Sequence, residues 1–301
     1  MNELLHELRD GVAYVTLNRP QARNALTFAM YERLAEICNK ANDDKSVKAI
    51  LITGAGDKAF AAGTDISQFR AFDKEQDALD YEARIDRVMN ALERCRVPTI
   101  AAIHGACTGG GASIAACCDL RIASRSMKYG FPVARTLGNC LSLASYNRLV
   151  YLVGPSLVKD IVFQARLVEA DEALAKGLVM ELHDDQATLL KRGEELARTV
   201  AGMAPLTLQA TKEAVLRLRP KIPHGECPHI FSAIQAFGFE FSHSENMPSR
   251  QKKQFPQEIG NGTTTRSPTF KFFTSGPTST TSPMNSCPTM SPFCMLGIKP
   301  P

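Results

Sequence analysis

Short apolar runs alternate with longer stretches of helical periodicity over the first 220 residues of the chain. The runs are bounded by polar or turn-forming residues, as strands usually are, and the last three are apolar enough to be buried on both faces. The predicted strands are "VAYVTLN" (Val12–Asn18), "AILIT" (Ala49–Thr53), "TIAAI" (Thr99–Ile103) and "DLRIA" (Asp119–Ala123).

Between these runs, apolar residues recur every three or four positions, as they do on the buried face of an amphipathic helix. One such stripe runs from Phe28 to Ala41, and a second runs from Tyr81 to Cys95. Three further helices, the first ending before a Gly-Pro pair, are predicted over Leu141–Val153, Leu189–Val200 and Leu206–Leu218. Strands that alternate with helices predict an α/β domain with crossover connections.

Residues 221–301 differ from this region in composition. Eleven of the seventeen prolines fall there, and twenty of the thirty residues in Thr263–Pro292 are Ser, Thr or Pro. Such a sequence buries too little apolar surface to offset the entropy of ordering it. We therefore expect a folded domain over residues 1–220 and a low-complexity, disordered tail over residues 221–301. A glycosylated mucin-like stalk and a frame-shifted gene end are alternatives that the sequence leaves open.

Charge and composition narrow the classes of function. The net charge is only +4 and the basic residues are scattered, so no nucleic-acid partner is expected. No run reaches the roughly 18 apolar residues of a membrane span, and the N-terminus has no apolar signal core, which favours a cytoplasmic location. The nine cysteines form no CxxC pair and no zinc-type cluster, so no metal site is predicted.

Glycines follow two of the predicted strands. The triplet Gly109–Gly111 opens a predicted helix, whose start offers unpaired N–H donors and the positive end of a dipole. No GxxxxGK[ST] or GxGxxG pattern accompanies it, so nucleotide binding is weakly supported. A second loop, Asp57–Phe69, again places small residues and glycine before a polar turn. Two such loops can each aim one N–H at a shared carbonyl oxygen, which is the arrangement of an oxyanion hole.

Four segments together resemble the crotonase superfamily, the enoyl-CoA hydratase/isomerase group: "NRPQARNAL" (Asn18–Leu26), "KAFAAGTDI" (Lys58–Ile66), "PTIAAIHGACTGGGASIAACCDLRIAS" (Pro98–Ser124) and "ARLVEADEALAKGLV" (Ala165–Val179). The resemblance covers about residues 5 to 218. It implies an α/β spiral of ββα units followed by helices, and a homotrimer or hexamer. It also implies acyl-CoA thioester substrates, so that coenzyme A belongs to the substrate and no separate cofactor is expected. The family's terminal helices have no match after Leu218, which implies weaker CoA binding or assembly.

The resemblance also implies roles for individual residues. The oxyanion-hole donors would be the backbone N–H groups of Thr64 and Gly110, and one such donor can contribute ~10²–10³ in rate. The positions that the family uses around the CoA and acyl groups are Arg23, Ala25, Leu26, Ala62, Gly63, Asp65, Ile66 and Val133.

Hydratases of this family carry two catalytic glutamates, and both are replaced in this sequence. Their positions hold Ser113 and Val133, neither of which can act as a carboxylate base. Water addition needs both a proton acceptor and a proton donor, so hydration by the two-glutamate mechanism is doubtful. Ser113 either binds a water or a polar acyl group, or bonds a helix carbonyl one turn back. Arg135 either holds a substrate carboxylate or lies on the surface, and the surface position is favoured.

Three functions therefore stay open at this point. The leading one is an acyl-CoA enzyme of the hydratase/isomerase family that stabilises a thioester enolate with altered acid–base residues. The second is a decarboxylase or hydrolase of the same superfamily that uses Arg135. The third is a CoA-thioester-binding protein without catalysis.

Overall fold

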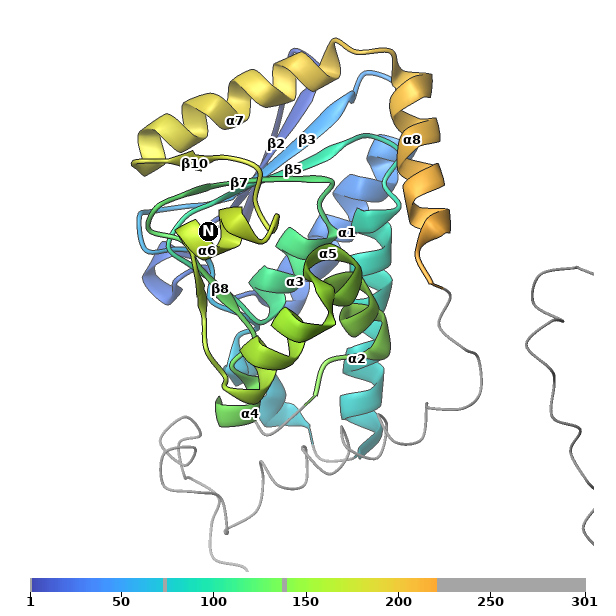
Figure 1. Ribbon diagram of the computed structural model, residues 1–301. Coiled ribbons are helices and arrows are strands. Elements are labelled where there is room, and N and C mark those ends of the chain that lie inside the picture. The colour runs from blue at the N-terminus through green and yellow to red at the C-terminus, as the bar shows by residue number, and fades with distance from the viewer. Residues whose placement is uncertain (1, 73–74, 137–139, 221–301) are drawn as a thin grey trace, which may run out of the picture. The chain divides into compact units, whose positions relative to one another are not determined.

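The computed structural model describes residues 2–72, 75–136 and 140–220, and its larger sheet contains all four strands that the sequence predicts (Figure 1). In order across this sheet the strands are β1 (Leu4–Arg9), β2 (Val12–Leu17), β3 (Ala49–Gly54), β5 (Thr99–Ile103), β7 (Leu120–Ser124) and β10 (Leu182–His183). β1 is antiparallel to β2, and every other neighbouring pair is parallel. Parallel neighbours need crossover connections, which the helices supply.

A smaller sheet continues the larger one. Its strands, in spatial order, are β4 (Ala59–Ala61), β6 (Ala106–Thr108), β8 (Lys128–Gly130) and β9 (Val168–Glu169). Along the chain, β3 is followed by β4, β5 by β6 and β7 by β8, and a helix comes after each pair. This strand–strand–helix repeat is the ββα unit of the predicted spiral, so the predicted fold class is confirmed.

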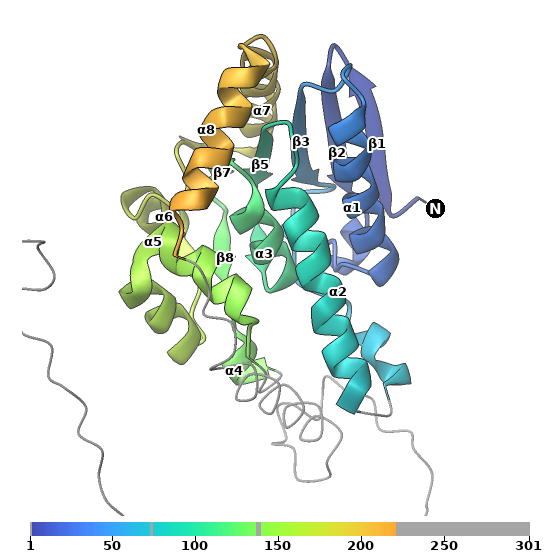
Figure 2. The same ribbon diagram turned by 90° about the vertical axis from the view of Figure 1, so that its right-hand side faces the viewer.

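Helices cover both faces of the larger sheet (Figures 1 and 2). On one face lie α1 (Phe28–Asp43), α2 (Glu75–Glu93) and α3 (Gly110–Cys117), and on the other lies α7 (Gln186–Ala201). Successive strand residues point to opposite faces, and β3 shows the result. Ile50 and Ile52 belong to the core shared with α1, α2 and α3, whereas Ala49 and Leu51 pack in a second core with Leu189 of α7.

The helix predicted to end at Val153 is longer than expected. The remaining helices are α4 (Val133–Thr136), α5 (Leu143–Phe163), α6 (Ala170–Ala175) and α8 (Pro205–Leu218), with two short 3₁₀ turns at Pro20–Ala22 and Ile66–Ala71. In α5 the backbone at Gly154 is non-helical, with φ 79° and ψ 158°. The helix axis breaks there, as predicted, but helical turns resume at Pro155, because proline is tolerated in a first helical turn.

Two predictions remain, one on the C-terminal tail and one on membrane-spanning helices. The predicted disordered tail, residues 221–301, lies outside the described residues. Within the ranges that the structure describes, no helix is both long enough and apolar enough to span a bilayer.

Candidate functional site

The first loop of the site presents the backbone of Thr64. The N–H of Leu26 donates to the carbonyl of Gly63 (2.8 Å), and the N–H of Asp65 donates to the carbonyl of Leu26 (2.9 Å). In this parallel bridge Thr64 lies between Gly63, whose carbonyl accepts, and Asp65, whose N–H donates. The N–H of Thr64 itself points to the opposite side. The N–H of Thr64 is therefore directed away from Leu26.

The second loop presents the backbone of Gly110, the first residue of α3. The first N–H groups of a helix have no partner within the helix, so this donor is available to a ligand. Gly109, just before it, has φ 51°, a left-handed conformation that glycine adopts without strain. A Cβ on Gly109 would lie only 3.5 Å from the Cα of Gly63, so the two loops are in contact. The structure thus brings together both predicted donor segments.

Two tyrosine hydroxyls hold the side chain of Thr64. Its Oγ1 lies 2.9 Å from the hydroxyl of Tyr31 on α1 and 2.9 Å from the hydroxyl of Tyr81 on α2. Burial raises the pKa of both phenols above the ordinary value, so both stay neutral at physiological pH. The same Tyr31 hydroxyl would lie 1.9 Å from a Cβ on Gly110, so a larger residue at position 110 would displace it. The sequence gives no sign of these two hydroxyl contacts, because Tyr81 fits an apolar helical stripe.

An aromatic wall surrounds the hydroxyl chain. The ring centroid of Tyr81 lies 4.8 Å from that of Phe69 and 5.6 Å from that of Phe28. Edge-to-face and tilted ring pairs of this kind pack favourably and exclude water. The Thr64 segment therefore lies against a largely apolar surface.

The predicted CoA-binding segments also meet. The N–H of Ala62 donates to the carbonyl of Arg23 (3.0 Å), and Leu26 bridges Thr64 as described above. The turn before them is fixed by Asn24, which is fully buried and donates from Nδ2 to the carbonyls of Ala55 (2.9 Å) and Ala59 (2.7 Å). Contact of Arg23, Ala25, Leu26, Ala62, Gly63, Asp65 and Ile66 with CoA stays a prediction.

The carboxylate of Asp65 is already engaged within the protein. It accepts hydrogen bonds from the N–H and hydroxyl of Ser67 (3.0 and 2.7 Å) and forms an ion pair with Arg19 (2.8 Å). Although burial opposes the change, these partners lower the pKa of Asp65. The side chain of Asp65 therefore caps the 3₁₀ turn that begins at Ile66.

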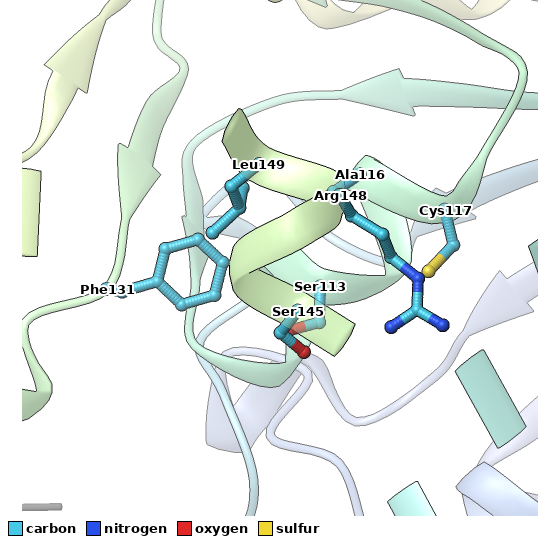
Figure 3. A pocket seen from close by; sticks show the side chains of 7 residues that line it. All are labelled: Ser113, Ala116, Cys117, Phe131, Ser145, Arg148 and Leu149. Atoms are coloured by element: carbon cyan, nitrogen blue, oxygen red, sulfur yellow. The ribbon is translucent and has the colours of Figure 1, made fainter. Parts of the chain in front are cut away.

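Ser113, one of the two predicted glutamate replacements, lines a small cavity. Figure 3 shows its lining side chains, which are Ser113, Ala116, Cys117, Phe131, Ser145, Arg148 and Leu149. The cavity volume is about 10 Å³, close to that needed by one water. No described residue bonds the Ser113 hydroxyl, and the Gly109 carbonyl one turn back accepts from the Ser113 backbone N–H instead (2.9 Å). Binding of a water or a polar acyl group by Ser113 stays a prediction.

Val133, the other predicted glutamate replacement, begins the short helix α4. Arg135, on the same helix, has an exposed side chain, in agreement with the surface alternative. Beyond α4, the Cys140 thiol has its pKa raised to about 11 by burial and by the nearby charge of Glu82, so it is a poor nucleophile at neutral pH. None of these three residues supplies a base.

Polar side chains one helical turn apart on α2 face α5. Asp86 accepts a hydrogen bond from the hydroxyl of Ser142 (2.8 Å). Further along, Asn90 and Glu93 accept from Arg148 at 2.7 and 3.2 Å. Glu82, one turn before Asp86, completes this row, and the described part of the chain offers it no hydrogen bond and no ion pair.

Glu82 has an unusual environment for a carboxylate. Burial, followed by the nearby charge of Asp86, raises its pKa to about 7. Its own charge in turn raises the pKa values of Tyr31, Tyr81 and Cys140, so it lies close to the hydroxyl chain and to the segment that follows α4. The sequence pattern does not distinguish Glu82, because a polar residue beside an apolar stripe is ordinary on a surface helix. Among the residues that the structure describes, no group of three or more His, Cys, Asp or Glu side chains could hold a metal ion.

Comparison with known sequences matches the chain along the whole of this region. A model of the family Enoyl-CoA hydratase/isomerase matches residues 7–220. The chain is 34% identical over 220 residues to the short-chain-enoyl-CoA hydratase of Clostridium acetobutylicum, covering 72% of this chain and 82% of that relative. It is also 34% identical over 220 residues to the mitochondrial Delta(3,5)-Delta(2,4)-dienoyl-CoA isomerase of Homo sapiens, covering 69% and 66% of the two chains.

A solved structure gives the same result for the fold. The crystal structure of an enoyl-CoA hydratase/carnithine racemase from Magnetospirillum magneticum aligns with a TM-score of 0.68 at 31% identity, over 82% of this chain and 90% of that chain. The family match, the relatives and the ββα repeat agree with one another. The chain belongs to the enoyl-CoA hydratase/isomerase family of acyl-CoA enzymes.

Proposed function

We propose that this enzyme binds an acyl-CoA thioester with its carbonyl oxygen between the backbone N–H groups of Thr64 and Gly110. There it stabilises the enolate that forms when the α-proton leaves. The contact between Gly109 and Gly63 carries this proposal, because it joins the loops that present the two donors. Fixed backbone donors stabilise charge that develops on the oxygen without any reorganisation during the reaction.

The CoA moiety would follow the segments that include Arg23 and Ala62. These segments are held together by the hydrogen bond from the Ala62 N–H to the Arg23 carbonyl (3.0 Å). A homotrimer or hexamer remains the expected assembly, and sedimentation of the purified chain measures it directly.

Hydration by two glutamates is not part of this function. Ser113 and Val133 cannot move a proton to or from water, so we expect no hydration of crotonyl-CoA above background. Loss of the enoyl absorbance measures this reaction. The decarboxylase alternative gains no support from the exposed Arg135, and release of CO₂ from malonyl-CoA would restore it.

Exchange of the α-protons of butyryl-CoA in D₂O tests the enolate directly, because each exchange passes through the enolate. The decisive variant removes one donor by Gly110→Pro. Since a Cβ at position 110 meets the Tyr31 hydroxyl, the change is made together with Tyr31→Phe. The matched control is Gly110→Ala in the same background, which adds a Cβ but keeps the N–H.

We expect the proline variant to exchange about 10²–10³-fold more slowly than the alanine control, with unchanged circular dichroism. Equal exchange in the two variants would show that the Gly110 N–H is not a donor to the thioester. Binding of butyryl-CoA by the wild-type chain without any exchange would instead identify a CoA-thioester-binding protein without catalysis.

A further inference from the structure

The polar row on α2 differs between its two ends. At the C-terminal end, Asn90 and Glu93 are paired with Arg148, which is only 5% exposed, and Asp86 is bonded to Ser142. At the N-terminal end, Glu82 follows Tyr81, whose hydroxyl bonds the side chain of Thr64. Glu82 is the member of the row for which α5 provides no partner in the described part of the chain.

The N-terminal end of α2 lies at the same end of the folded region as α4 in both views (Figures 1 and 2), and Glu82 is the eighth of the 19 residues of α2. α4 begins at Val133, where the resemblance to the family implies a glutamate in hydratases. Tyr81, the residue before Glu82, bonds the side chain of Thr64, and the charge of Glu82 raises the pKa of Cys140, which follows α4.

We propose that Glu82 is the proton-transfer residue of this enzyme, acting from α2 in place of carboxylates at positions 113 and 133. This inference rests on the proposed function, since it needs an acyl-CoA thioester bound in the site and an enolate formed from it. The reaction is then the shift of a double bond in a 3-enoyl-CoA thioester, which one carboxylate can complete alone.

The step is balanced without a co-reactant. The Glu82 carboxylate takes a proton from C2 of the 3-enoyl thioester, so that a C–H bond breaks and an O–H bond forms. The electron pair moves onto the thioester oxygen, where the N–H groups of Thr64 and Gly110 stabilise it. When the carbonyl re-forms, the C2–C3 double bond forms and C4 takes the proton back from Glu82. Substrate and product are isomers, and the carboxylate is regenerated.

The surroundings of Glu82 suit both halves of this step. Burial and the charge of Asp86 raise its pKa to about 7, so both protonation states are populated near neutral pH. The charge of Glu82 in turn acts on Tyr31 from α1, on its neighbour Tyr81 and on Cys140 before α5. The pKa values of all three are raised, so they stay protonated and neutral, and none of them holds Glu82 permanently ionised.

The test uses the full chain with hex-3-enoyl-CoA, and formation of the conjugated 2-enoyl thioester is followed by its absorbance. We expect Glu82→Gln to lower kcat by at least about 100-fold, with an unchanged dissociation constant for butyryl-CoA. Glu82→Asp should restore part of kcat. The wild-type rate should rise with pH through an apparent pKa near 7, and the residual Glu82→Gln rate should lack this rise.

The matched control is Asp80→Asn, which removes an exposed carboxylate from the same helix; this carboxylate accepts a hydrogen bond from Gln76 (2.8 Å). It should retain wild-type activity. Wild-type isomerisation in Glu82→Gln would overturn the inference, as would butyryl-CoA binding by the wild type without isomerisation or α-proton exchange. If Glu82→Gln loses isomerisation and Gly110→Pro does not, Glu82 remains the proton-transfer residue and the Gly110 N–H is not an oxyanion donor.

Discussion

The candidate site has two halves, one formed by backbone groups and the other by side chains. The half that we propose receives the thioester oxygen is backbone: the N–H groups of Thr64 and Gly110 are positioned by a β-bridge and by the start of a helix. The half that we propose moves protons is a side chain on α2, where that helix faces α5. The sequence resemblance covers the first half, whereas Ser113 and Val133 stand at the positions where it implies glutamates. In this proposal the backbone recognises the thioester and a different helix supplies the proton transfer.

The largest effect should come from Arg148, which holds the side-chain half together. It is only 5% exposed and bonds Asn90 and Glu93, so Arg148→Ala removes buried ionic and hydrogen-bonding partners at once. We expect a loss of about 3 kcal/mol in the free energy of unfolding, measured with urea. The control is Arg198→Ala, which breaks the exposed pair with Glu194 and should cost at most about 0.5 kcal/mol. Similar losses in both would mean that α2 and α5 are not held together by Arg148.

Glu82→Gln should stabilise the fold by an amount that depends on pH. The pKa of Glu82 is raised from 4.5 to about 7, so between these pH values the native state binds more protons than the unfolded state. The wild type therefore loses stability as the pH rises through this window, and the loss is complete above it. Gln has no proton to lose, so we expect an advantage for Glu82→Gln of about 3 kcal/mol at pH 8 that fades toward pH 4.5.

Urea titrations of both proteins at several pH values measure this difference. A difference that does not change with pH would place Glu82 in a water-like environment. The same titrations test the foundation of the proton-transfer inference without any substrate, because they depend only on the environment of the carboxyl group.

The sequence predicts the central strands of the larger sheet well, because their apolar runs are long. The four strands from Val12 to Ala123 were found because their apolar runs match buried strands. β1 was not predicted, since only Leu4 of its six residues is buried and no alternation shows. The strands of the smaller sheet have three residues or fewer, which is too short for any period to be visible.

Sequence predicts the backbone half of the site better than the side-chain half. The glycines at 109 and 110 are visible in the sequence: Gly109 has a positive φ, and a Cβ on Gly110 would meet the Tyr31 hydroxyl. The sequence carries no comparable sign for Glu82. What distinguishes this residue is that the described part of α5, about sixty residues later in the chain, offers it no hydrogen bond or ion pair. Tyr31 likewise fits the apolar pattern of α1, and only the fold brings its hydroxyl to Thr64.

The smallest effects compare two glycines, one of which belongs to the backbone half. A Cβ on Gly111 in α3 would lie 2.3 Å from the Ala61 carbonyl oxygen, so Gly111→Ala must push α3 away from β4. We expect a loss of about 1–3 kcal/mol in unfolding free energy, together with weaker butyryl-CoA binding. Gly193 in α7 leaves room, since its nearest neighbour, a Leu51 methyl, would be 3.4 Å away.

Gly193→Ala should therefore stabilise the protein by up to about 1 kcal/mol through helix propensity, with butyryl-CoA binding unchanged. Urea unfolding and calorimetric titration with butyryl-CoA measure both quantities for each variant. If tight packing of α3 on β4 holds the Gly110 N–H in place, the two variants must change the unfolding free energy in opposite directions. Stabilisation by Gly111→Ala would mean that this packing is loose, and the backbone half would then owe its geometry to the bound thioester instead of to the fold.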